Sequence, residues 1–124
     1  MDPMCGSGSF LLEAARSWPL ARYIGVDVSE EQLRRSENNA AQAVLNVTYV
    51  KGDVCAPGGI PVPDGSVDKL MADLPYGKQY EIPDCEGGFH ASVLREFARV
   101  VRGDGRIVVV VDEPHLADVL SGVE

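Results

Sequence analysis

Short runs of apolar, often β-branched residues alternate with helical segments along this chain, and this alternation limits the fold most. The runs predict strands at residues 23–28, 47–50, 67–72 and 107–111. Helical spacing predicts helices at about 11–18, 29–44 and 94–101, with a short helix expected after residue 111. This order is typical of a doubly wound, mostly parallel α/β sheet. The run at 107–111 (IVVVV) is expected to be buried on both faces.

The segment after residue 28 carries a helix-start signal. Ser29 followed by Gln32 forms a capping box, in which each side chain bonds the other residue's backbone N–H. Glu30 and Glu31 suit the positive end of the helix dipole and precede Arg34 and Arg35 by four residues. We therefore expect a helix to start directly after Ser29.

The composition of the chain limits the class of protein to which it can belong. A chain of 124 residues, 45% apolar and 24% charged, predicts one globular domain over residues 1–124. No apolar run approaches the ~20 residues of a membrane span, so we expect no membrane contact and a cytoplasmic or nuclear location. The net charge of −8 repels phosphate backbones, so affinity for nucleic acid would have to come from another domain or a partner. Three scattered cysteines, with no metal-ligand spacing, favour reduced thiols and no metal.

A glycine-rich turn opens the chain, with sequence DPMCGSGS over residues 2–9. Gly6 and Gly8 permit a tight backbone and a close approach of a ligand. Asp27 ends a predicted strand nineteen residues after Gly8, near the spacing of a carboxylate that accepts ribose hydroxyls. Asp53 follows the next strand and is a candidate acceptor for the amine of an adenine ring. Each aspartate alone is equally consistent with a strand-end cap, but together they favour a nucleoside site.

The turn favours S-adenosylmethionine over a dinucleotide. A dinucleotide site prefers the pattern GxGxxG, and Leu11 stands where the third glycine would be. Asp2 would repel phosphates and suits a cationic ligand better. S-adenosylmethionine carries an ammonium and a sulfonium and has no phosphate, so it is the predicted cofactor.

The segment Asp73-Leu74-Pro75-Tyr76 follows the third predicted strand and is the candidate catalytic motif. An exocyclic amine is a poor nucleophile because its lone pair is delocalised into the base. The carboxylate of Asp73 and a backbone carbonyl can accept its N–H groups and localise that lone pair. Pro75 lacks an N–H and fixes the turn, and Tyr76 can stack on a base removed from its helix.

Together, DPMCGSGSFLLEAA (residues 2–15) and DLPYGK (73–78) resemble the methylase domain of THUMP-domain-containing RNA guanosine N2-methyltransferases. The resemblance implies a Rossmann-like class I fold and methyl transfer from S-adenosylmethionine to guanosine N2 in tRNA or small nuclear RNA. It implies that Asp2, Gly6 and Gly8 line the methionine part of the cofactor, Asp27 binds the ribose and Asp53 the adenine. It also implies Asp73, Pro75 and Tyr76 as catalytic residues, and a small zinc-binding activator protein as a partner.

The chain departs from that family pattern at both ends. The family carries an apolar strand before the first turn, a THUMP domain upstream and a final hairpin, so this chain is expected to be a partial methylase domain. On that basis we expect weak or no activity from the isolated chain. The remaining alternatives are a non-catalytic fragment or isoform, an amino-methyltransferase acting on adenine N6 or a protein glutamine, and a dinucleotide oxidoreductase.

Overall fold

The computed structural model describes residues 1–75, 77 and 81–122. They form two compact units, Met1–Asp53 and Val54–Glu124, and each is treated by itself below. Among the described residues, no helix is long and apolar enough to span a bilayer.

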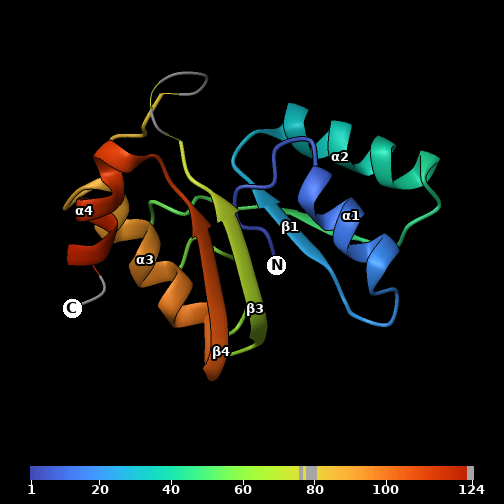
Figure 1. Cartoon of the computed structure of the whole chain (residues 1–124). Coiled ribbons are helices and arrows are strands. Elements are labelled where there is room, and N and C mark those ends of the chain that lie inside the picture. Colours follow the sequence, from blue (N-terminus) through green and yellow to red (C-terminus); the bar gives the residue numbers. More distant parts are fainter. Residues whose placement is uncertain (76, 78–80, 123–124) are drawn as a thin grey trace. The chain divides into compact units, whose positions relative to one another are not determined.

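The first unit consists of two helices and a pair of parallel strands (Figure 1). Its elements are α1 (Ser9–Ser17), β1 (Ile24–Asp27), α2 (Glu30–Gln42) and β2 (Thr48–Lys51). β1 and β2 pair in parallel, with Gly25 opposite Tyr49. A core of Cys5, Leu11 and Leu33, with Tyr23, Val47 and Tyr49 packed against it, joins the helices to the strands. These elements fall at the predicted positions.

The glycine-rich turn is attached to the free edge of β1. Asp2 forms an isolated parallel bridge with Gly25, in which the Asp2 N–H donates to the Ile24 carbonyl at 3.0 Å. The Val26 N–H donates to the Asp2 carbonyl, and the Cys5 N–H donates to the Val26 carbonyl, both at 2.9 Å. The chain therefore runs parallel to β1 before it turns at the carboxyl end of the strand, where the sequence predicted a ligand site.

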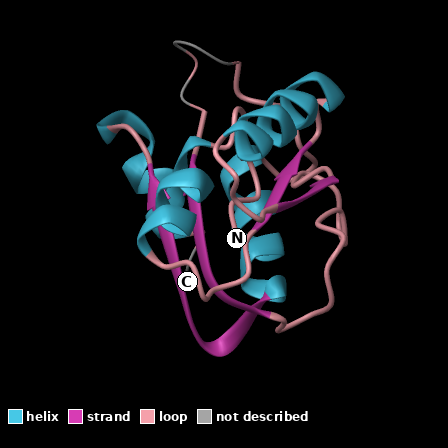
Figure 2. Ribbon diagram, turned by 90° about the vertical axis from the view of Figure 1, so that its right-hand side faces the viewer, coloured by secondary structure: helices cyan, strands magenta, loops and turns pink. Residues whose placement is uncertain are grey.

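The second unit repeats the arrangement of parallel strands with helices (Figures 1 and 2). Its elements are β3 (Val67–Asp73), α3 (Phe89–Val100), β4 (Val101–Val110) and α4 (Glu113–Ser121). β3 and β4 pair in parallel, with Ala72 opposite Val109. The largest of its fully buried side chains are Ile60, Leu70, Leu74, Val93, Phe97 and Val100. The predicted α/β class with parallel strands is thus confirmed, and the described strands form two two-stranded sheets.

The prediction that residues 107–111 are buried on both faces is wrong. Val108 and Val110 are each 47% exposed. β4 is longer than the predicted strand and contains Gly103 and Gly105. In the described sheet β4 pairs only with β3, and Val108 lies opposite Met71, which is 39% exposed. Since Leu70 and Ala72 point into the core, the alternate side chains share a face that faces away from it.

The expectation of three reduced thiols is also wrong. Cys55 and Cys85 form a disulfide, whereas Cys5 is free and buried. The two bridged residues are 30 positions apart in the sequence, and the fold of the second unit brings them together. Cysteine spacing could not reveal this pair, because the contact depends on how the loops before β3 and α3 are placed.

Candidate cofactor and acceptor sites

The glycine-rich turn is shaped by hydrogen bonds to its own backbone. The Gly6 N–H donates to Oδ2 of Asp27 at 2.9 Å, and the Gly8 N–H donates to the Cys5 carbonyl at 2.8 Å. Gly8 has φ +84°, and an added Cβ would lie 2.8 Å from the Tyr49 hydroxyl. Gly6 also has a positive φ, +51°, but nothing lies within 4 Å of its would-be Cβ. Gly8 is therefore required by packing, and Gly6 leaves open space above the turn.

Asp27 links the end of β1 to two neighbouring segments. Its Oδ2 accepts the Gly6 N–H and its Oδ1 accepts the Ser29 N–H, both at 2.9 Å. An ionised carboxylate has about four acceptor positions, so two of them remain for a ligand hydroxyl on this half-buried side chain. The Ser29 cap itself is confirmed, because Ser29 Oγ accepts the Gln32 N–H at 3.3 Å. The predicted return bond of the capping box is wrong, because Asp27 already accepts the Ser29 N–H.

Asp2 is held inside the first unit. Its residue is only 3% exposed, and its Oδ1 accepts the Met4 N–H at 3.1 Å. With its backbone paired to β1, Asp2 closes the start of the turn, so it has a structural role that the sequence did not predict. Its contact with the methionine part of a cofactor stays a prediction.

Asp53 is exposed just beyond the carboxyl end of β2. The Gly52 N–H donates to the Asp27 carbonyl at 3.1 Å, which extends the ladder between the two strands by one residue. Asp27 and Asp53 therefore follow neighbouring parallel strands at the same edge, as the sequence predicted. Their roles toward ribose and adenine remain predictions.

Sequence reasoning missed the polar residues beneath the turn. Ser36, which is fully buried, donates through Oγ to the Gly6 carbonyl, and Asn39 donates through Nδ2 to the Ser7 carbonyl. Burial raises the pKa of the Tyr49 hydroxyl and of the Cys5 thiol, each to about 12. Both groups are therefore neutral at physiological pH. The only signal in the sequence was the polar content of α2, which also fits a solvated helix face.

The candidate catalytic motif, which starts at Asp73, begins at the end of β3. The Leu74 N–H donates to the Val110 carbonyl at 2.9 Å, and the Leu74 side chain is buried. Asp73 is exposed, and within the described part of the chain its carboxylate forms no hydrogen bond or ion pair. Pro75 is half-buried directly after this anchor. Tyr76, the predicted stacking residue, lies outside the described residues.

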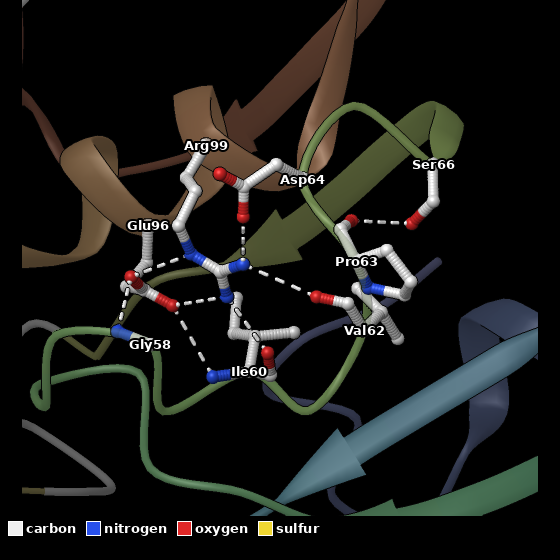
Figure 3. Close-up of polar contacts among 8 residues, drawn as sticks. All are labelled: Gly58, Ile60, Val62, Pro63, Asp64, Ser66, Glu96 and Arg99. Carbon is white, nitrogen blue, oxygen red and sulfur yellow. Dashed lines mark hydrogen bonds and ion pairs between the residues drawn. The ribbon is translucent and has the colours of Figure 1, made fainter.

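An ion pair between buried Glu96 and half-buried Arg99 holds the loop that leads into β3 (Figure 3). Both oxygens of Glu96 are used: Oε1 accepts the Gly58 N–H at 2.7 Å and Oε2 accepts the Ile60 N–H at 3.2 Å. Arg99 donates to both Glu96 oxygens, at 3.0 and 2.8 Å. Burial alone would raise the pKa of Glu96, but these hydrogen bonds outweigh it and hold that pKa below its usual value.

Arg99 also reaches the far half of the same loop. Its guanidinium donates to the carbonyls of Ile60 and Val62, at 2.7 and 3.1 Å, and to the carboxylate of Asp64 at 2.7 Å (Figure 3). A planar guanidinium with five N–H groups suits such a set of acceptors, and lysine would not. The Pro- and Gly-rich segment before β3 is thus held in place by two side chains of α3.

Comparisons with known proteins show the family of the chain. A family-wide sequence profile of the RMKL-like methyltransferase domain matches residues 1–122. The chain is 38% identical over 117 residues to the human U6 snRNA (guanine-N(2))-methyltransferase THUMPD2, a match that covers 93% of this chain and 22% of the relative. It is 30% identical to the bovine tRNA (guanine(6)-N(2))-methyltransferase THUMP3, over 99% of this chain and 27% of the relative.

Solved structures show the same fold. TrmN from Thermus thermophilus matches with a TM-score of 0.76 and 25% identity, over 94% of this chain and 34% of that one. The chain spans only about a quarter of the length of the two curated relatives described above. The profile match covers nearly every residue, and the glycine turn and the strand-end aspartates lie where a nucleoside site is expected. The chain therefore belongs to the RMKL-like methyltransferase domain family.

Proposed function

We propose that this chain takes part in methyl transfer from S-adenosylmethionine to N2 of guanosine in RNA, either a tRNA or a small nuclear RNA. The names of its relatives support this reaction, because both act on guanine N2 of an RNA. One observation carries the proposal furthest. The Asp27 carboxylate binds the Gly6 N–H, so the glycine turn and a strand-end acceptor form one built structure.

The residues of the turn suit this cofactor. The side chains that bond the turn, from Asp27, Ser36 and Asn39, are acidic or neutral. A cationic group without phosphate is favoured there, and a diphosphate would be repelled. The open space above Gly6 allows the methionine part to approach the backbone, and Asp27 keeps acceptor positions for the ribose hydroxyls. Asp53 would accept the adenine amine.

The turn after β3 suits the methyl acceptor. S-adenosylmethionine would supply an electrophilic methyl group and leave as the neutral thioether. The exposed Asp73 carboxylate would accept one N–H of the guanine amine, and a carbonyl held by the Pro75 turn would accept the other. These two acceptors would localise the nitrogen lone pair for attack on a methyl group, and the proton that the product nitrogen loses would pass to solvent. Tyr76 would stack on the base.

Binding of RNA needs help from outside this sequence. The net charge of −8 opposes a phosphate backbone, so we propose that further domains or partners supply most of the RNA affinity. A small zinc-binding activator protein is the second partner that we propose. We also propose a cytoplasmic or nuclear location, which the RNA classes named for the relatives support.

The test is a single-turnover reaction with the chain in excess over RNA, with and without the activator protein. Transcripts of a tRNA and of U6 small nuclear RNA are incubated with S-adenosylmethionine that carries a labelled methyl group. The digested nucleosides are then analysed by mass spectrometry. We expect N2-methylguanosine as the labelled product, and protein in excess makes even a slow reaction visible.

The other outcomes separate the alternatives. Label found in N6-methyladenosine, or in a glutamine amide of added protein, would show that this group, and not guanosine N2, is the methyl acceptor. Binding of S-adenosylmethionine without product under any condition would favour a non-catalytic fragment or isoform. Stabilisation by NAD instead of S-adenosylmethionine would point to an oxidoreductase and overturn the proposal.

A further inference from the structure

Two side chains of α2 hold the carbonyls of the glycine-rich turn. Ser36 Oγ lies 2.5 Å from the Gly6 carbonyl oxygen, and Asn39 Nδ2 lies 3.0 Å from the Ser7 carbonyl oxygen. Ser36 is completely buried, although serine is usually exposed. Positions 36 and 39 are three residues apart, so they lie on the same face of the helix. That face of α2 therefore contacts the glycine-rich turn and is not only exposed to solvent.

These two bonds fix how the peptide groups of the turn are oriented. In a trans peptide the C=O and the following N–H point in opposite directions. Because Ser36 holds the Gly6 carbonyl toward α2, the N–H of Ser7 must point away from α2. Backbone oxygens of β1 and of the turn itself accept the N–H groups of Cys5 and Gly8. The Ser7 N–H is therefore presented outward as a donor, on an exposed residue.

The side chain of Tyr49, a residue of β2, fills the space under the same turn. An added Cβ at Gly8 would lie 2.8 Å from the Tyr49 hydroxyl and 3.2 Å from Ser36 Oγ. The Tyr49 hydroxyl is buried, and it has no hydrogen-bond partner among the described residues. Tyr49 and Ser36 thus meet beneath Gly8, and the turn cannot sink toward α2. The orientation set by Ser36 and Asn39 is the one that the packing allows.

We propose that Ser36 and Asn39 are positioning residues for the cofactor: by binding the Gly6 and Ser7 carbonyls, they orient the turn so that its Ser7 N–H meets an acceptor group of the ligand. The inference rests on the proposed function, because the ligand is S-adenosylmethionine. Neither side chain needs to touch the ligand itself. The carboxylate of the amino-acid part is the acceptor group that matches an outward N–H.

The experiment is calorimetric titration of S-adenosylmethionine into the 124-residue chain and four variants. Ser36→Ala and Asn39→Ala each remove one bond to the turn. Asn38→Ala is the matched control on the same helix, because the Asn38 side chain is exposed and forms no hydrogen bond with another described residue. Tyr23→Phe is the control for a lost hydroxyl, because that hydroxyl donates to the carbonyls of Ala14 and Trp18.

We expect Ser36→Ala to raise the Kd about tenfold and Asn39→Ala about threefold, since each loses one hydrogen bond that orders the site. Asn38→Ala and Tyr23→Phe should stay within about twofold of the unchanged chain. Equal affinities for all five proteins would overturn the inference. If Ser36→Ala fails to fold, the exposed Asn39 still gives the decisive comparison with Asn38.

A second measurement does not depend on the cofactor. Amide hydrogen exchange of residues 5–9 should be faster in Ser36→Ala and unchanged in Tyr23→Phe, because only the first change frees the turn. Unchanged exchange in Ser36→Ala would contradict the positioning role, whatever the ligand. If the unchanged chain does not bind S-adenosylmethionine, the proposed function fails and so does the cofactor part of this inference. The exchange data then decide only whether Ser36 orders the turn.

Discussion

Asp27 and Asp73 both end a parallel strand, but their surroundings differ. Both oxygens of Asp27 accept backbone N–H groups, one from the glycine turn and one from the start of α2. Asp73 is exposed and has no such bonds to the part of the chain that the structure describes. The first aspartate helps to build a rigid turn that a cofactor can enter. In the proposed reaction, the second would present a carboxylate to the incoming amine.

This difference fits the two roles proposed for the strand ends, cofactor binding at Asp27 and acceptor binding at Asp73. A cofactor that is bound in every cycle benefits from a turn that is already in place, because little entropy is lost on binding. An acceptor carboxylate must exchange one partner for another, and water is the easiest partner to displace. The predictions below test this contrast, beginning with the largest expected effect.

Replacing Asp73 by alanine should abolish methyl transfer and leave the fold intact. We expect the single-turnover rate to fall about 100-fold or more, because the amine loses the acceptor that directs its lone pair. The melting temperature and the Kd for S-adenosylmethionine should not change, since the Asp73 side chain forms no hydrogen bond or ion pair with the described residues. Asp68→Ala, on the same strand and also exposed, is the control and should keep its activity. A variant Asp73→Ala with normal activity would remove the acceptor role.

Glu96→Gln tests whether the second unit has a rigid part of its own. The change removes the charge of buried Glu96 and one of the two oxygens that accept N–H groups from Gly58, Ile60 and Arg99. Because Arg99 keeps its ion pair with Asp64, we expect a loss of about 2 kcal/mol in unfolding free energy. Chemical denaturation measures it. Glu113→Gln, an exposed residue at the start of α4, should cost less than about 0.5 kcal/mol. Equal costs for the two variants would show that the ion pair does not stabilise the loop.

The same carboxyl group predicts a dependence on pH. Its pKa is lower in the folded chain than the reference value of 4.5, so its stabilisation is complete above pH 4.5 and is lost as the pH falls through the folded pKa. The gap in stability between the unchanged chain and Glu96→Gln should therefore shrink in acid. A gap that stays constant from pH 7 to pH 3 would contradict this assignment.

Alanine at the two glycines of the turn separates backbone strain from packing. Both residues have positive φ, so each alanine costs about 1 kcal/mol in strain. Only at Gly8 does the new methyl group meet Tyr49 and Ser36, which adds about 1–2 kcal/mol. In thermal unfolding, Gly8→Ala should have a lower melting temperature than Gly6→Ala. The reverse order would mean that Tyr49 does not pack under the turn.

The thiol of Cys5 reports on the burial of the same region without any substitution. With a pKa raised to about 12 by burial, it should react with iodoacetamide at pH 8 about 100 times more slowly in the folded chain than in the unfolded one. After unfolding without reductant, one thiol per chain should react, because Cys55 and Cys85 are bridged. Three reactive thiols under those conditions would rule out the disulfide.

The sequence was sufficient for the features that depend on neighbouring residues. The helix start at Ser29, the strands that end at Asp27 and Asp73, and the placement of the glycine turn at a strand end all follow from local patterns. These patterns work because caps, turns and alternation act over a few residues. The class of fold and the family followed from the order of these elements and two motifs.

Features that depend on distant partners could not be predicted. The roles of Ser36 and Asn39 require that α2 lie over a turn thirty residues earlier, which no local pattern records. The Ser29 N–H went to Asp27 instead of Gln32, because the strand end already offered a carboxylate. The exposure of Val108 and Val110 depends on which face of β4 the core of the second unit uses. Such outcomes are decided by tertiary packing.

The central claim is that the first unit holds a built site for S-adenosylmethionine. Calorimetric titration of the 124-residue chain tests it most directly, with Asp27→Asn as the comparison, since an amide there can no longer accept with both atoms the N–H groups of Gly6 and Ser29. We predict a Kd in the micromolar range for the unchanged chain and a value at least about tenfold higher for Asp27→Asn. No heat of binding from the unchanged chain, or equal affinity for both proteins, would contradict the account.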